Sequence, residues 1–206
     1  FSKIIAGTMT WGEWGKNYNT EQMIDLMNCC LENEITTFDH ADIYGNYTTE
    51  SRFGKALSES KVDRSTVQII SKCGIQLPSE KRGNRIKHYN YYKEYIIWSV
   101  EQSLKNLETE YLDLLLLHRP SPLMNPEEIA EAVERLKRDG KIFDFGVSNF
   151  TPLQCDLIET KVNINYNQIK FSVTHFDPMI DGSFEYMQTH NIIPMSWSPL
   201  GSVFKK

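Results

Sequence analysis

Four side chains capable of acid–base chemistry lie at or near the ends of strand-like segments. Asp39 ends the second such segment, Lys72 the third and His118 the fourth, while Tyr44 follows Asp39 by five residues. An ammonium beside a phenol stabilises phenolate and so lowers the pKa of the phenol, and a carboxylate orients the ammonium. A tyrosine tuned in this way can give a proton to a carbonyl oxygen, and a histidine can hydrogen-bond the same oxygen. Because no side chain supplies a hydride, this set implies a hydride donor from outside the chain.

Each of these residues also has an ordinary structural explanation. A buried lysine commonly pairs with a carboxylate, His118 next to Arg119 and Pro120 can be structural, and Tyr44 before Gly45 can close a turn. A purely structural role for all four residues would require each of these explanations to apply at once, at strand ends that lie on the same face of the barrel. We therefore interpret the four residues as one site.

Seven short runs rich in β-branched residues or leucine predict the strands that position these side chains. They cover residues 3–7, 36–39, 67–72, 112–118, 143–148, 165–172 and 192–198. Helical periodicity or capping residues predict helices over 20–33, 49–57 and 91–107, and further helices that start after Asn125 and Thr151. The alternation of strands and helices indicates a parallel sheet covered by helices. The polar stretch 74–90 is predicted to be an irregular loop that is functional or mobile.

Polar or aromatic residues recur at the carboxyl ends of the predicted strands, at intervals near one strand–helix unit. They are Thr8, Asp39, Lys72, His118, Ser148, Gln168 and Trp197. In a (β/α)8 barrel these ends converge on the face where the site is built. A doubly wound sheet would carry a glycine-rich turn after its first strand, but the turn from Gly7 reads GTMTWG. We therefore predict an α/β fold, a (β/α)8 TIM barrel with seven of its eight strand–helix units visible.

Composition limits the class of protein. The 206 residues include 22 basic and 27 acidic side chains, a net charge of −5, and 40% are hydrophobic, as in an ordinary folded domain spanning 1–206. The mild acidity argues against a nucleic-acid partner, and no apolar run approaches the ~20 residues of a membrane span. The four cysteines lack CxxC or metal-ligand spacing, so we interpret them as reduced thiols of a cytoplasmic protein.

Taken together, these segments resemble the aldo-keto reductase family. The resemblance rests on FDHADIYG from Phe38, SKCG from Ser71, LLLHRP from Leu115, GVSNF from Gly146, Asn167-Gln168 and WSPLG from Trp197, in family order. The KHYN sequence from Lys87 in the third loop is similar to that of bacterial oxidoreductases within the family. The family begins with a β-hairpin and continues into an eighth strand and a basic segment that grips the adenosine 2′-phosphate. We therefore expect this chain to be part of a longer protein.

The resemblance implies an NADP-dependent oxidoreductase that reduces an aldehyde or ketone to an alcohol, with NAD as the alternative cofactor. Tyr44 would be the general acid, Lys72 would lower its pKa, Asp39 would pair with Lys72, and His118 would orient the carbonyl. The small-molecule carbonyl substrate would lie against Trp11 and Arg119. No metal is expected, and the family's usual state is a monomer.

The resemblance also implies a set of cofactor-binding residues: Thr8, Ser148, Asn149, Gln168, Trp197, Ser198, Leu200 and Ser202. Within this set, Ser148, Asn149 and Gln168 would hold the nicotinamide carboxamide. Trp197 would stack on the nicotinamide ring, where tyrosine is the commoner residue. The turn with Ser198, Leu200 and Ser202 would contact the pyrophosphate.

Two other functions stay open at the level of sequence. One is a barrel of the same fold that senses a cofactor or binds a partner without catalysis. The other is a metal-dependent barrel hydrolase with Asp39, His40, His118 and His175 as ligands. The hydrolase leaves Tyr44 without a role, and His40 would point away from Asp39 in extended backbone.

Overall fold

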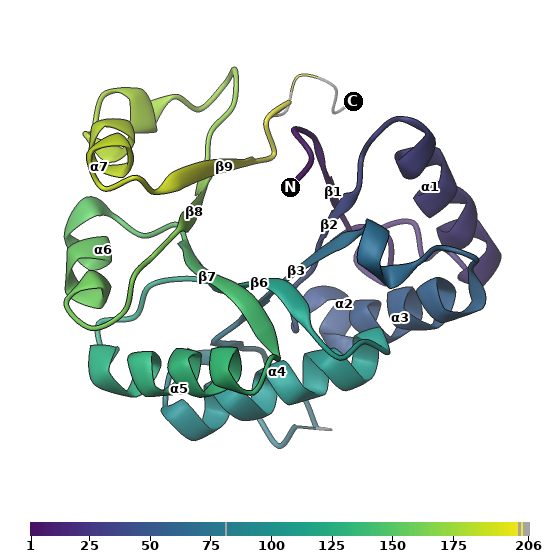
Figure 1. Ribbon diagram of the computed structural model, residues 1–206, viewed down its shortest axis with the longest axis horizontal. Helices are drawn as coiled ribbons and strands as arrows, with labels where there is room; N and C mark the ends of the chain where they lie inside the picture. Colours follow the sequence, from purple (N-terminus) through teal and green to yellow (C-terminus); the bar gives the residue numbers. More distant parts are fainter. Residues whose placement is uncertain (81, 202, 204–206) are drawn as a thin grey trace.

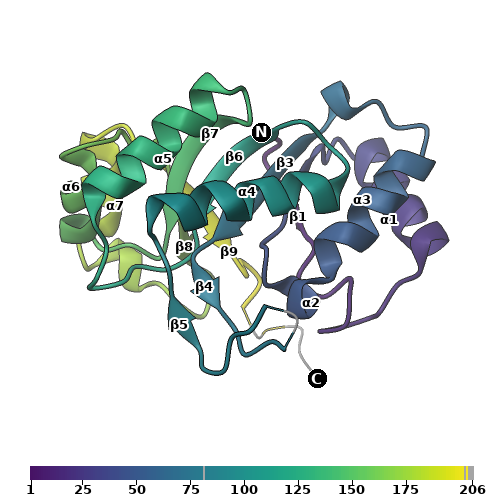
Figure 2. The ribbon, with the colours of Figure 1, turned by 90° about the horizontal axis from the view of Figure 1, so that it is seen from below.

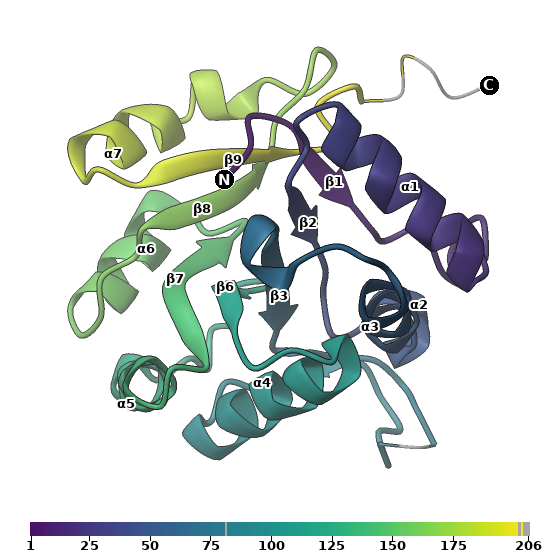
Figure 3. The same cartoon turned by 45° about the vertical axis from the view of Figure 1, so that its right-hand side comes forward.

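A curved sheet of seven parallel strands forms the centre of the computed structural model, which describes residues 1–80, 82–201 and 203. The strand order is β1-β2-β3-β6-β7-β8-β9, and every neighbouring pair is parallel. The strands are β1 (Ile5–Gly7), β2 (Thr37–Asp39), β3 (Gln68–Cys73), β6 (Leu112–Leu117), β7 (Ile142–Ser148), β8 (Tyr166–Lys170) and β9 (Ile193–Trp197). Helices lie outside the arc that the strands form (Figures 1 and 3). The architecture is the predicted (β/α) barrel with seven strands, and β1 and β9 each pair on one side only among the described residues.

The helices expected after Asn125 and Thr151 begin at these caps. The helices are α1 (Thr20–Glu32), α2 (Tyr44–Tyr47), α3 (Thr49–Glu59), α4 (Lys93–Leu107), α5 (Pro126–Arg138), α6 (Pro152–Glu159) and α7 (Ser183–Thr189), with 3-10 turns η1 (Arg64–Thr66) and η2 (Asp177–Met179). The Asn125 side chain accepts from the Glu127 N–H at 3.0 Å, and Thr151 forms a capping box with Gln154. None of the described helices combines the length and apolar character needed to cross a bilayer.

Strand β6 is buried on both faces, as its leucine run predicts. Leu115 and Leu117 belong to the large core between sheet and helices. Leu114 and Leu116 belong instead to the smaller core inside the barrel. Each fully buried leucine contributes about 2 kcal/mol to folding. The strands that end in the candidate site therefore rest on well-packed cores.

Residues 74–80 and 82–90 form an ordered arm, so the prediction of an irregular loop is wrong. Strand β4 (Ile75–Gln76) pairs antiparallel with β5 (His88–Tyr89), and a further bridge joins Ser79 to Asn84. At the base of the arm, Gly74 has φ +110°, and a Cβ there would lie 2.1 Å from Cε1 of Tyr91. The arm, α2 and the end of β9 lie at the same end of the molecule (Figure 2).

Candidate active site

The four predicted acid–base residues come together around one buried ammonium. Lys72 Nζ donates to Asp39 Oδ2 at 2.7 Å, to the His40 carbonyl at 2.8 Å and to Tyr44 Oη at 3.1 Å. These three bonds use every N–H of the ammonium. Because the Tyr44 oxygen accepts from Lys72, its own hydrogen is left to point elsewhere. The ring of His118 lies edge-on to that of Tyr44, with centroids 6.0 Å apart.

The loop after β2 places Tyr44 over the end of β3. The Asp42 N–H donates to the Lys72 carbonyl at 3.0 Å, which ties the loop to that strand. The chain then turns sharply in α2, where Gly45 has φ +57° and Tyr47 φ +69°. A Cβ at Gly45 would lie 2.5 Å from Oγ1 of Thr49, so glycine is required there.

Burial sets the protonation states of the site. Burial raises the pKa of Tyr44, and the nearby Lys72 charge lowers it by less, so the phenol is protonated at neutral pH. The expected effect of Lys72 is thus present but smaller than that of burial. Burial alone would lower the pKa of Lys72. Asp39 and Tyr44 together raise this pKa by more than burial lowers it, so the lysine is charged. Burial, with the Lys72 and Arg119 charges, lowers the pKa of His118 well below its usual value and keeps the imidazole neutral.

The expected carboxamide-binding residues form a hydrogen-bonded chain along the ends of β7 to β9. The Trp197 indole N–H donates to Asn149 Oδ1 at 2.8 Å, and Asn149 Nδ2 donates to Ser148 Oγ at 2.8 Å. Gln168 Nε2 donates to Asp39 Oδ1 at 3.0 Å, which joins this chain to the Lys72 cluster. Asn149 keeps a second amide hydrogen and Gln168 its carbonyl oxygen, so the pair can accept from and donate to a carboxamide.

Two backbone positions near this chain are strained. Asn149 has φ +61° and Ser198 has φ +50°, both left-handed values that non-glycine residues rarely adopt. Ser198 borders a cleft of about 760 Å³ between β1 and β9, whose wall includes Asp39, Gln168 and Trp197. Leu200 is 63% exposed beyond the cleft, and Ser202 lies outside the described residues.

Thr8 lies beneath the site rather than on its surface. The residue is fully buried. Its hydroxyl donates to the Asp39 carbonyl at 3.0 Å and lies 2.9 Å from Nδ1 of His40. The side chain therefore supports the end of β2 and the loop that follows, and its expected contact with a cofactor stays a prediction.

The two residues expected at the substrate pocket differ in placement. Trp11 packs against Phe53 of α3, with ring centroids 6.2 Å apart, and belongs to the layer between sheet and helices. A different tryptophan, Trp14, lies beside the site: it is 38% exposed, with its ring 6.1 Å from that of Tyr44. Sequence reasoning missed Trp14, although an aromatic residue in the loop after the first strand was an available signal. Arg119 is partly buried, with Cζ 5.7 Å from the Trp197 ring centroid.

Tyr91 is a second residue that sequence reasoning missed. Its hydroxyl donates to the Arg119 carbonyl and accepts from the Arg119 N–H at 3.2 Å. This pair of bonds fixes the backbone immediately after His118. No motif marks Tyr91, because its role depends on the close approach of Gly74 to its ring.

A buried carboxyl lies behind the site. Asp42 Oδ2 accepts from the Tyr95 and Ser99 hydroxyls, each at 3.2 Å, and lies 3.7 Å from Arg82 Nη1 of the arm. Burial, and next the charge of Glu50, raise the pKa of Asp42 to about 7. The arm is thus anchored to a carboxyl group that titrates near neutral pH.

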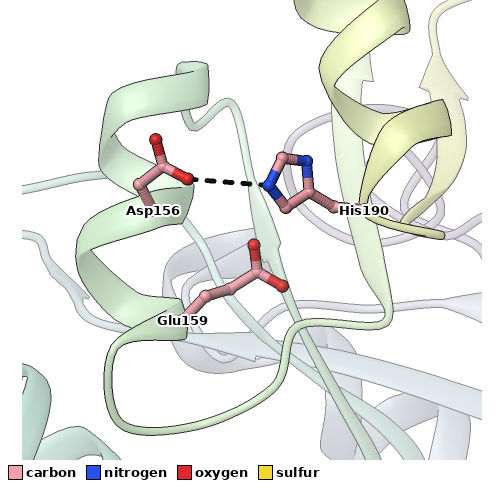
Figure 4. Close-up of side chains that lie close together, drawn as sticks. All are labelled: Asp156, Glu159 and His190. Atoms are coloured by element: carbon pink, nitrogen blue, oxygen red, sulfur yellow. Dashed lines mark ion pairs between the residues drawn. The ribbon is translucent and has the colours of Figure 1, made fainter.

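The proposed hydrolase ligands do not form a cluster. Among the described residues, one group has the spacing of metal ligands, Asp156, Glu159 and His190. It lies between α6 and the end of α7, outside the barrel (Figure 4). His40 is fully buried against Thr8, away from this group. The geometry at the mouth therefore favours acid–base chemistry over metal-dependent hydrolysis.

A parallel barrel with its polar side chains gathered at the carboxyl ends of the strands defines the class of the protein, a (β/α)-barrel of enzyme type. The sequence profile described as "Aldo/keto reductase family" matches residues 3–205, and the chain belongs to this family.

Individual relatives agree with this assignment. The chain is 46% identical to the uncharacterized oxidoreductase YcsN of Bacillus subtilis, over 99% of this chain and 69% of the relative. It is 40% identical to a 6-dehydroglucose reductase of Agrobacterium fabrum, over 97% of this chain and 69% of the relative. Among solved structures, the glycerol dehydrogenase of Gluconobacter oxydans superposes with a TM-score of 0.83 at 26% identity, covering 95% of this chain and 59% of that one. The chain thus spans about two thirds of these curated relatives and less of the solved structure.

Proposed function

We propose that the protein is an NADP-dependent oxidoreductase that reduces an aldehyde or ketone to the alcohol. The main observation that supports this proposal is the ammonium of Lys72, which donates at the same time to Asp39, to the His40 carbonyl and to Tyr44. This arrangement leaves the hydroxyl hydrogen of Tyr44 available to a ligand. Family membership and the oxidoreductase names of the relatives support the same reaction class.

The residues of the chain would handle the proton of the reaction. NADPH, when bound, supplies the hydride that reduces the carbonyl carbon. Tyr44 gives its proton to the carbonyl oxygen, so that one hydride and one proton convert the carbonyl into an alcohol. The Lys72 ammonium stabilises the phenolate that Tyr44 becomes, and Asp39 holds the ammonium in place. In the oxidation direction, Tyr44 takes the proton back.

His118 would position the substrate. Its Nδ1 is buried and has no hydrogen-bond partner among the described residues. A hydrogen on Nδ1 would therefore be a buried, unsatisfied donor, which costs free energy. The neutral ring therefore carries its hydrogen on Nε2, from which it donates to the carbonyl oxygen.

The cofactor fits the chain of polar residues on β7 to β9. Asn149, Ser148 and Gln168 would hold the carboxamide through the donor and acceptor that they keep free. Trp197 offers a partly exposed indole for stacking, and Ser198 and Leu200 flank it in the following turn. The proposal further includes a monomeric, cytoplasmic protein, which size-exclusion chromatography and cell fractionation would check.

The exchange Tyr44→Phe tests this function. In the intact protein, we expect the turnover of aldehydes to fall by about 10²–10⁴-fold because the proton donor is lost, while NADPH binds with unchanged affinity. Tyr92→Phe is the matched control, because Tyr92 is 66% exposed. NADPH consumption with a panel of aldehydes and calorimetry of NADPH binding provide the two readouts. A protein that binds NADPH but oxidises it equally slowly with and without Tyr44 would instead be a cofactor sensor.

A further inference from the structure

Arg119 is a partly buried arginine whose guanidinium has no acceptor among the described residues. Within residues 1–80, 82–201 and 203, the guanidinium donates no hydrogen bond and lies within ion-pair distance of no carboxylate. Two other partly buried arginines donate to acceptors in the protein, Arg52 to the Tyr18 carbonyl at 2.7 Å and Arg64 to Asp113 at 2.8 Å, and Arg82 lies 3.7 Å from Asp42. Arginines that are removed from water are usually paired in this way.

The guanidinium of Arg119 lies near Trp197 at the mouth of the barrel. Its Cζ is 5.7 Å from the Trp197 ring centroid. Burial is the main cause of the pKa shifts of Tyr44, which is raised, and of His118, which is lowered. The positive charge of Arg119 lowers the pKa of both groups. The guanidinium is therefore within electrostatic reach of the groups that would meet the substrate carbonyl.

The backbone of Arg119 is held in place. Tyr91 both donates to its carbonyl and accepts from its N–H, and Tyr91 is itself buried under the arm. A charged side chain on a fixed backbone can bind a ligand group at low entropic cost.

Further cationic side chains lie near Arg119. Lys87 contributes to the positive field on His118, and Lys170 Nζ lies 5.9 Å from the Trp197 ring centroid. The carboxylate at the mouth, Asp39, is already paired with Lys72 at 2.7 Å. Arg119 thus lies among other cationic side chains, and the planar fork of its guanidinium matches carboxylates and phosphates.

We propose that the substrate carries an anionic oxygen group, a carboxylate or a phosphate monoester, and that Arg119 binds this group while Tyr44 and His118 engage the carbonyl. The inference deepens the function proposed above and rests on it. The pyrophosphate of a nicotinamide dinucleotide is separated from the reacting ring by a ribose. Arg119 directly follows His118 in the sequence, and we therefore assign its anion to the substrate rather than to the pyrophosphate.

Matched aldehydes test the inference in the intact protein. The anionic probes are 4-carboxybenzaldehyde and 4-formylphenyl phosphate, and the neutral probe is methyl 4-formylbenzoate. We expect kcat/KM to favour at least one anionic probe by about 10- to 100-fold, the range of one charge-assisted hydrogen-bonded pair. Which probe is favoured distinguishes carboxylate from phosphate. Arg119→Met should abolish the preference for the anionic probes, while Arg119→Lys keeps part of it.

Arg138→Met is the control for net charge, because Arg138 is exposed at the end of α5, opposite the mouth. It should leave all three kcat/KM values unchanged. Equal losses for all probes in Arg119→Met would overturn the inference, as would a weaker Kd for NADPH, which would assign Arg119 to the cofactor.

A binding measurement separates this inference from the proposed function. Terephthalate has no reducible carbonyl, so its calorimetric Kd for the NADP⁺ complex does not depend on turnover. Binding that falls about 10-fold or more in Arg119→Met supports an anion site at Arg119 even if no aldehyde is reduced. Turnover of aldehydes with no charge preference and no terephthalate binding would overturn the anion site and leave the reductase intact.

Discussion

The two sides of the mouth differ in how their side chains are held. On the side of β2, β3 and β6, Lys72 is 1% exposed and all of its hydrogens are bonded within the protein. On the side of β8 and β9, Ile193 is 52% exposed and Leu200 63% exposed, next to the cleft. The proposed proton chemistry is thus part of the core, where a change costs stability. The proposed cofactor contacts Trp197 and Leu200 are more exposed than Lys72, so a change there costs less stability.

The largest effect in this comparison is expected for Lys72→Met. The exchange leaves the Asp39 carboxylate buried without its cation, so the free energy of unfolding should fall by about 3 kcal/mol. Turnover should fall by about 10³-fold because the Tyr44 phenolate loses its stabilising charge. Urea unfolding and NADPH consumption measure the two effects. Lys55→Met, at an exposed lysine of α3, should change neither, and a Lys72→Met protein of unaltered stability would remove the basis of the comparison.

A smaller effect is expected from Asp42, which lies behind the proton-handling side. Its pKa is about 7 in the folded protein and near 3.8 in the unfolded chain, so the folded state binds the extra proton between these values. Stability therefore falls as pH rises, by about 2 kcal/mol between pH 5 and pH 7. His40, with its pKa lowered to about 3 by burial, has the opposite slope below pH 6.5.

Asp42→Asn isolates this contribution. The difference in unfolding free energy between the original protein and the variant, measured in urea at pH 5, 6, 7 and 8, cancels the slope from His40. The variant should gain relative stability as pH rises. A difference that stays constant from pH 5 to pH 8 would show that the Asp42 carboxyl is not held protonated.

The smallest effects are expected on the cleft side, at Trp197. Trp197→Phe removes the N–H that donates to Asn149 at 2.8 Å but keeps an aromatic face, so the Kd for NADPH should change by less than about 3-fold. Trp197→Leu also removes the face and should weaken NADPH binding by about 10-fold. Both variants should lose less than about 1 kcal/mol of unfolding free energy. A loss as large as that of Lys72→Met would mean that the two sides do not differ.

Hydrophobic periodicity and caps predicted the seven strands of the sheet and the helices α1, α3, α4, α5 and α6, but not α2 or α7. The leucines of β6 alternate between two cores, and Asn125 caps α5 as expected. Glu128, three residues after the Asn125 cap, accepts from the Lys93 N–H of α4 at 3.0 Å instead of reaching back to the start of its own helix. That difference arises because a contact between helices replaces a local one, which the local sequence does not encode. The pairing of β4 with β5 was missed for a similar reason, since two-residue strands carry no period.

The candidate site was predictable where a residue ends a strand and less so where it lies in a loop. Asp39, Lys72 and His118 meet because parallel strands bring their carboxyl ends to one face. Trp11 and Trp14 lie three residues apart in one loop, and the loop conformation decided which of them meets Tyr44. The net direction of the Tyr44 pKa also depended on burial, which the sequence does not give.

The close approach of Gly74 to Tyr91 gives evolution an indirect way to alter ligand preference. Any side chain at Gly74 would push the Tyr91 ring away, because even a Cβ would lie 2.1 Å from Cε1. A displaced ring would release the backbone of Arg119, which Tyr91 holds from both its carbonyl and its N–H. A single substitution at Gly74 would thus change the proposed ligand preference at Arg119 while the acid–base residues stay the same.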